Sequence, residues 1–370
     1  MKTVSFVHRS ASAAVVVLML LGTACVLAAD FTDADVSYSV TDGTGKTFTF
    51  SDEPSHIATI GVGVTATAIQ IGALDKIVVT DKYSKTNTSV VFSDLQSKIA
   101  DGTVRANGSG YSTGHSDVKA DLVYVADNGK FDKEKDAVII TGSYTTLESL
   151  VSDLNTAGFK NVLVWKDITD YADLADFVKS VSITITGKVT SYVDQMKYVS
   201  KDIKDELAGV EKRDAMYVTY SGGDYKVGNT GSLANSMIIA AGGNSISVDS
   251  SQSKSTYGDK NTVANLIINH PDAVIFLDSS VASDDAKVAE IRAMGSGTTL
   301  VALEPLWNNY SIDSMNGVWT MAKAMYPDIF SGDIPVIEPD DGDNTMLYIG
   351  AAVAVVAIVC IVGFLFLRKN

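Results

Sequence analysis

Short runs of apolar, β-branched residues alternate along the middle of the chain with longer segments whose apolar residues recur every three or four positions. This alternation is typical of parallel strands joined by crossover helices. Residues 146–157 give the clearest helix, because Leu147, Leu150, Val151 and Leu154 fall on one helical face. The pattern therefore predicts an α/β protein.

The predicted elements form two sets. In the first, the strand-like runs are residues 57–62, 76–80, 121–125, 137–140 and 161–165. In the second, strands are predicted at 215–220, 273–277 and 298–302, and helices at 233–241, 263–269, 283–294 and 314–325. We therefore expect two Rossmann-like lobes, residues 30–187 and 214–330, each with its own sheet.

One amphipathic segment, residues 188–213, connects the two predicted lobes. Its apolar residues step by three or four from Val189 through Val193 to Val210, and only Gly209 interrupts them. This pattern predicts a single helix of about 25 residues, or ~37 Å. A rigid connector of that length is expected to limit movement of the lobes.

The two ends of the chain predict secretion and a membrane anchor. Residues 1–29 combine basic residues, an apolar stretch and small residues before a cleavage point, as secretory signal peptides do. Residues 346–367 are uncharged and long enough to span a bilayer, and the short tail after them, residues 368–370, contains Arg368 and Lys369. The acidic, proline-containing residues 331–345 resemble a stalk. These features predict a single-pass protein of the cell membrane whose lobes are extracellular.

Composition and charge narrow the possible functions. The 44 acidic and 29 basic residues give a net charge of −15, which disfavours nucleic acid as a partner. Both cysteines, Cys25 and Cys360, lie in the terminal apolar runs, so the lobes between them have neither disulfides nor thiolate metal sites. The four histidines have no metal-binding spacing, and neither phosphate-binding loops nor a nucleophile elbow are present. We expect no bound metal, no cofactor and no enzymatic activity.

Several motifs occur in an order that resembles one known family. They are Pro54-Ser55-His56-Ile57, Ile71-Gly72-Ala73-Leu74-Asp75, Asp121-Leu122-Val123-Tyr124, Thr186-Gly187-Lys188, Ala241-Gly242-Gly243-Asn244 and Asn269-His270-Pro271-Asp272-Ala273. Over roughly residues 38–330 the chain resembles the class III substrate-binding proteins of ABC importers for iron-siderophores, cobalamin and haem. The resemblance implies a two-lobed α/β clamp with one bridging helix and a ligand in the cleft.

The chain departs from this family at two positions. Proteins of the family often dock onto the permease through one glutamate in each lobe. Aligned on Gly72 and Pro271, the corresponding residues here are Ala66 and Ala264. This departure motivates a second hypothesis, a surface interaction or sensory protein that kept the fold without permease docking.

Candidate binding residues come from the loops expected to follow the strands, since ligands of parallel α/β lobes meet those loops. Their aromatic rings suit a large planar or macrocyclic ligand. The candidates are Tyr83, Arg105, Tyr111, His115, Tyr144, Tyr225, Tyr257, Trp307 and Tyr310. For each aromatic residue, packing inside its own lobe is an alternative, and Arg105 and His115 could equally be surface residues.

Three functional hypotheses follow. The first is a binding protein that captures an iron-siderophore, cobalamin or haem and delivers it to an ABC permease. The second is the interaction or sensory protein without transport. The third is an extracytoplasmic chelatase-like enzyme on a related two-lobe fold, for which the sequence offers no convergent acid and base residues.

Overall fold

The computed structural model describes residues 37–110, 114–142, 146–166, 168–295 and 297–337. The predicted signal peptide, transmembrane segment and terminal residues lie outside these ranges. Within them, the chain divides into a first unit (up to Ile168, with Asp176–Thr190 and Asn309–Ile312) and a second unit formed by the remainder. No helix in the described part is both long and apolar enough to span a bilayer.

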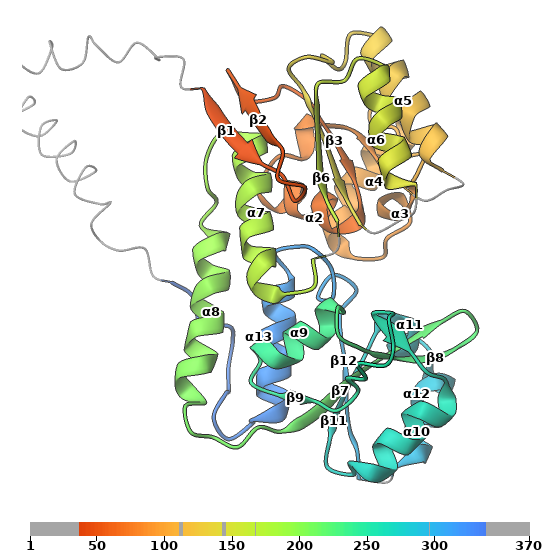
Figure 1. Cartoon of the computed structure of the whole chain (residues 1–370), viewed down its shortest axis with the longest axis vertical. Coiled ribbons are helices and arrows are strands. Elements are labelled where there is room, and N and C mark those ends of the chain that lie inside the picture. Colours follow the sequence, from red (N-terminus) through yellow and green to blue (C-terminus); the bar gives the residue numbers. More distant parts are fainter. Residues whose placement is uncertain (1–36, 111–113, 143–145, 167, 296, 338–370) are drawn as a thin grey trace, which may run out of the picture. The chain divides into compact units, whose positions relative to one another are not determined.

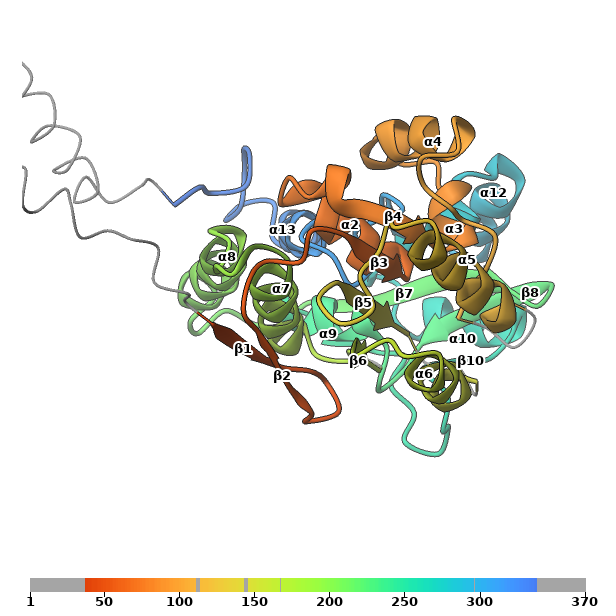
Figure 2. The same ribbon diagram turned by 90° about the horizontal axis from the view of Figure 1, so that it is seen from above.

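The first unit (Figure 1) contains a four-stranded parallel sheet in the order β4 (Ile77–Thr80), β3 (Ile57–Ile60), β5 (Ala137–Thr141), β6 (Asn161–Trp165), an order that can be followed in Figure 2. Every residue of β3, β4 and β5 is buried. Parallel sheets with both faces covered have this continuous apolar character, which is why the sequence predicted these four strands.

Helices cover both faces of this sheet. On one face, Leu122 of α5 (His115–Asp127) and Leu150 of α6 (Leu147–Thr156) pack with Ile60 and Ile140 in one core. On the other, the Trp165 ring contacts Phe177 of α7 (Tyr171–Thr186) at 5.5 Å. Figure 2 shows α5 and α6 on one side of the strands and α7 on the other. The remaining helices of this unit are α2 (Val62–Gln70), α3 (Lys82–Lys85) and α4 (Ser93–Ala100), and 3-10 turns span Leu74–Lys76 and Val90–Phe92. Helix α2 contacts β3 and β5.

A hairpin of β1 (Tyr38–Thr41) and β2 (Thr47–Phe50) precedes the sheet. The Tyr38 ring stacks on Phe50 at 5.4 Å, and its hydroxyl donates to the Thr184 carbonyl at 3.1 Å. Burial, with Glu53 and Asp52 nearby, raises the pKa of Tyr38 to about 12. The hairpin is thereby held against α7.

The second unit contains a mixed sheet in the order β10 (Thr256–Tyr257), β8 (Asp224–Gly228), β7 (Asp214–Ser221), β11 (Val274–Leu277), β12 (Thr299–Ala302), with β9 (Asn244–Ser245) also paired to β7. β7, β11 and β12 are parallel, whereas β8 and β10 are antiparallel to their neighbours. The sequence predicted β7, β11 and β12 but not the antiparallel edge.

Helices again cover both faces. Residues of α10 (Lys260–Asn269), α11 (Ser279–Ala282) and α12 (Asp285–Met294) share one core with β7 and β11. α9 (Leu233–Ala240) and α13 (Ser314–Met325) lie on the opposite side (Figure 1), where α8 (Tyr192–Glu206) contacts both. The mixed α/β class predicted from the sequence is therefore correct for both units.

The strand predicted at residues 121–125 is wrong. These residues belong to α5, in which Val118, Leu122 and Val125 are buried at helical spacing. A short apolar run does not distinguish a strand from one face of a helix. The strand that follows is β5.

The single helix predicted over residues 188–213 is also wrong. α7 ends at Thr186, and Gly187 has a positive φ of 65°, a conformation that commonly terminates helices. α8 begins only at Tyr192, ends at Glu206 and belongs entirely to the second unit, whereas the residues of α7 are shared between the units. Since no single rigid helix spans residues 188–213, this segment gives no reason to expect limited movement of the lobes.

The segment from Tyr220 to Tyr225, expected as a binding loop, is the hairpin that joins β7 to β8. Ser221 pairs with Asp224, and the two residues between them, Gly222 and Gly223, have φ of 63° and 86°. Two positive φ angles in a two-residue turn match the twist of antiparallel strands and favour glycine. The hairpin directs Tyr225 into the core of the second unit.

Replacing Gly223 by alanine is expected to destabilise the second unit by about 1 kcal/mol, because an L-residue is strained at positive φ. Gly297→Ala is the matched control, since no atom lies within 4 Å of an added Cβ and its φ lies outside the left-handed region. Urea unfolding followed by tryptophan fluorescence measures both. Equal stability of the two variants would contradict the turn assignment.

Candidate functional site

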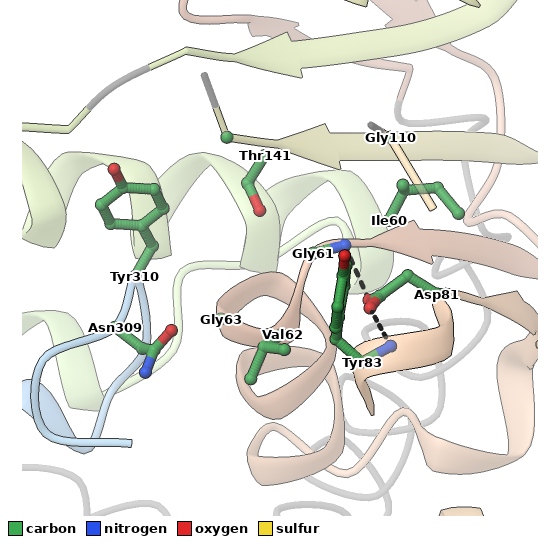
Figure 3. A pocket seen from close by; sticks show the side chains of 11 residues that line it. Ile60, Gly61, Val62, Gly63, Asp81, Tyr83, Gly110, Thr141, Asn309 and Tyr310 are labelled. Carbon is green, nitrogen blue, oxygen red and sulfur yellow. Dashed lines mark hydrogen bonds between the residues drawn. The ribbon is translucent and has the colours of Figure 1, made fainter. Parts of the chain in front are cut away.

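A pocket of about 500 Å³ opens in the first unit at the carboxyl ends of β3, β4 and β5 (Figure 3). Ligands of parallel α/β sheets bind in this position. The pocket is lined by Ile60, Gly61, Val62, Gly63, Asp81, Tyr83, Gly110, Thr141, Gly142, Asn309 and Tyr310, all of which belong to the first unit.

Two glycines allow the pocket wall to form. Gly61, between β3 and α2, has φ of 129°, and a Cβ there would lie 2.1 Å from Thr141 Oγ1. A Cβ on Gly63 would lie 2.6 Å from the Tyr310 carbonyl oxygen. The first turn of α2 can therefore approach both Thr141 and Tyr310, and the backbone N–H groups of a helix's first turn have no partners within the helix.

Asp81 is the one ionisable carboxylate of the described lining. Its Oδ2 accepts from the Gly61 N–H (2.9 Å) and the Ser84 hydroxyl (2.8 Å), and its Oδ1 accepts from the N–H groups of Tyr83 (2.8 Å) and Ser84 (3.1 Å). Burial raises the pKa of Asp81, and these hydrogen bonds act in the opposite direction. The side chain thus fixes the ends of β3 and β4 relative to each other.

A layer of buried threonine hydroxyls supports the pocket from the sheet side. Thr65 Oγ1 lies 2.9 Å from Thr59 Oγ1, 3.1 Å from Thr80 Oγ1 and 2.9 Å from the Gly61 carbonyl oxygen. A satisfied polar network of this kind restricts the positions of its members. It couples α2 to β3 and β4 directly beneath Gly61.

Of the candidate binding residues in the first unit, Tyr83 and Tyr310 line the pocket. Tyr83 is 43% exposed. Tyr111 and Tyr144 lie outside the described residues; in the sequence Tyr111 directly follows Gly110, and Tyr144 is two residues after Gly142.

Arg105 and His115 are engaged elsewhere in the first unit. Arg105 Nε donates to buried Asp121 at 2.6 Å, and its guanidinium lies 4.1 Å from the centre of the Tyr124 ring. His115 begins α5, with Nε2 3.7 Å from Asp153 Oδ2. Neither residue belongs to the pocket lining. Arg105 neutralises the buried carboxylate of Asp121.

The candidates in the second unit have partners within that unit. Tyr225 is 2% exposed, and its hydroxyl donates to Glu290 Oε2 at 2.5 Å. The Tyr257 hydroxyl donates to the Ser247 carbonyl at 2.9 Å. Trp307 is half-buried. Of the seven candidates that lie in the described residues, two line the pocket, Tyr83 and Tyr310.

Sequence reasoning missed the small residues of the site. Gly61 and Gly63 directly follow a buried strand and open a helix, a signal present in the sequence. Thr141 directly follows the strand predicted at residues 137–140, the place where binding residues of such sheets occur. Asn309 neither directly follows a predicted strand nor opens a predicted helix, so the sequence pattern did not indicate it.

No family model matches the sequence, and no curated protein matches it. Solved structures do. The molybdate periplasmic binding protein MolA from Haemophilus influenzae is 16% identical, with a TM-score of 0.60 over 79% of this chain and 92% of MolA. A periplasmic haem-binding protein from Pseudomonas aeruginosa is 14% identical, with a TM-score of 0.55 over 76% of this chain and 96% of that protein. The vitamin B12 binding protein BtuF of Vibrio cholerae is 15% identical, with a TM-score of 0.50 over 74% and 97%.

The chain has the fold of the periplasmic substrate-binding proteins.

The structure of this substrate-binding fold corrects the alignment of the docking positions. Ala66 is fully buried in α2, so it cannot correspond to an exposed residue that contacts a permease. Ala264 is half-buried in α10. The alignment on Gly72 therefore fails in the first unit, and Ala66 gives no reason to exclude docking.

Proposed function

We propose that this chain is a membrane-tethered extracellular substrate-binding protein that captures an iron chelate, corrinoid or haem for an ABC importer. The observation that carries the proposal is the pocket of about 500 Å³ at the carboxyl ends of β3, β4 and β5. That volume is within the range of small-molecule sites, which is about 300–1,000 Å³.

The fold supports the same proposal. The solved structures with this fold include proteins whose descriptions name haem, vitamin B12 and molybdate as ligands. All are described as binding proteins, in line with a non-enzymatic role here. The predicted signal peptide and transmembrane helix supply the tether in this proposal.

Candidate polar and aromatic contacts are present at the pocket. Tyr83 and Tyr310 offer ring faces, and Thr141 offers a hydroxyl. Rings bury a large apolar area at a small cost in conformational entropy, which suits a bulky chelate.

The experiment is a titration of the full-length protein in detergent with cyanocobalamin, a ferric trihydroxamate, a ferric tris-catecholate and haemin. Visible spectra and calorimetry report binding. We expect at least one of these chelates to bind with a Kd of about 1 μM or lower, corresponding to ~8 kcal/mol. If none binds, the proposed function is wrong.

The interaction or sensory protein remains the second hypothesis. Its motive was the pair Ala66 and Ala264, and the buried position of Ala66 removes half of that motive. Ligand-dependent stimulation of a permease's ATPase activity by the full-length protein would favour transport, and chelate binding without any such partner would favour the second hypothesis.

A further inference from the structure

The lining of the first-unit pocket is rich in hydrogen-bond donors but poor in positive charge. Among the described lining residues there is no lysine, arginine or histidine, and the one ionisable carboxylate is Asp81. Lys82 lies outside the lining, with Nζ 5.2 Å from the centre of the Tyr83 ring.

Thr141 supplies a donor aimed into this pocket. Thr141 is only 5% exposed, and it lines the pocket at the end of β5. Its hydroxyl makes no hydrogen bond within the described part of the chain. Figure 3 shows this hydroxyl directed toward Gly61 and Tyr83. Because this hydroxyl lies at the pocket surface, it can donate to a ligand oxygen or to water there.

The first turn of α2 supplies further donors on the same side. Gly61, Val62 and Gly63 all line the pocket, and the N–H of Gly61 is already bonded to Asp81. The next N–H groups of the helix begin at Val62, where a ligand oxygen would meet the positive end of the helix. Thr141 and α2 therefore converge on a place for an acceptor oxygen.

From this juxtaposition we infer that the pocket binds an uncharged metal chelate through its acceptor oxygens, such as the amides of a corrinoid or the hydroxamates of a ferric trihydroxamate. This inference rests on the proposed function and narrows its ligand class. Haemin, with two carboxylates, and a ferric tris-catecholate would bring negative charge against a wall that contains Asp81 and no cation. Burying a charge without a partner is strongly unfavourable, and the net charge of −15 repels anions at long range.

The first test compares the four chelates on the full-length protein in detergent by calorimetry. The inference predicts that cyanocobalamin or the ferric trihydroxamate binds at least about tenfold more tightly than haemin and the tris-catecholate. Tighter binding of haemin or the tris-catecholate would overturn the inference and leave the proposed function standing. Binding of none would overturn both.

The second test changes the charge of the wall. Val62→Lys adds a cation at a half-buried lining position, and Val62→Gln is its uncharged control of similar length. The lysine variant is expected to gain about tenfold in affinity for haemin relative to the glutamine variant. Equal haemin affinities of the two would contradict selection by charge.

The third test concerns the hydroxyl of Thr141. Thr141→Val preserves the shape and removes the donor, whereas Thr141→Ser keeps the donor. We expect the valine variant to bind the uncharged chelate about tenfold more weakly and the serine variant to bind it as the unchanged protein does. Thermal unfolding of each variant separates loss of binding from loss of fold. A correctly folded valine variant with undiminished affinity would overturn the role of Thr141.

Discussion

Replacing Gly61 by alanine is expected to abolish ligand binding and to destabilise the first unit by about 3 to 5 kcal/mol. Two effects add. A φ of 129° is strained for any L-residue, and the new Cβ would lie 2.1 Å from Thr141 Oγ1. The ends of β3 and β5 would have to separate, which moves Thr141 away from the first turn of α2. Urea unfolding and chelate titration measure the two losses.

Gly72→Ala is the matched control for Gly61→Ala. Gly72 also has a positive φ, 83°, but no atom lies within 4 Å of an added Cβ. This variant should lose only the cost of backbone strain, about 1 to 2 kcal/mol, and should bind ligand normally. If the two variants lose the same stability and both bind ligand, close packing at Gly61 does not shape the pocket.

Replacing Arg105 by alanine should destabilise the first unit by about 2 kcal/mol and leave ligand affinity unchanged. The buried carboxylate of Asp121 would lose its cation and keep only the hydrogen bonds from the Asn107 N–H (2.9 Å) and side-chain amide (2.8 Å). The cost is below that of a fully buried pair because the Arg105 side chain is 32% exposed. Urea unfolding and chelate titration again give both quantities.

Arg292→Ala provides the comparison, because Arg292 is an exposed residue in the last turn of α12 and its loss should have little effect on stability. A stable Arg105→Ala protein with weakened chelate binding would instead support the sequence-based interpretation of Arg105 as a ligand contact.

The sequence predicted the elements whose own residues form a clear apolar pattern. The strand at residues 161–165 and the helix at residues 314–325 match β6 and α13 at both ends. After Asn161, β6 is a continuous apolar run, and the buried residues of α13 include Met315, Val318 and Ala322 at helical spacing. The local pattern of apolar residues is sufficient to predict such elements.

Elements stabilised mainly by their surroundings were missed. α2 contains Gly63 and several β-branched residues, which lower intrinsic helix propensity, yet six of its nine residues are buried. Tertiary packing against β3 and β5 forms this helix. The β7–β8 hairpin was missed because Gly222 and Gly223 were interpreted as a flexible loop instead of a two-residue turn.

The pocket lies at loops that follow predicted strands, and its lining includes two of the predicted candidates, Tyr83 and Tyr310. Aromatic residues also fill cores, as Tyr225 does, and nothing local in the sequence separates the two roles. The close approach of Gly63 to Tyr310 joins residues far apart in the chain, so local pattern could not reveal it.

The most direct test of the account is the position of the metal in a bound chelate. Crystals of the protein grown with cyanocobalamin or a ferric trihydroxamate would give an anomalous difference peak for cobalt or iron. The account predicts that the chelate occupies the first-unit pocket, with a ligand oxygen in contact with Thr141 Oγ1 and the first turn of α2. A chelate bound elsewhere on the protein, with solvent in this pocket, would contradict it.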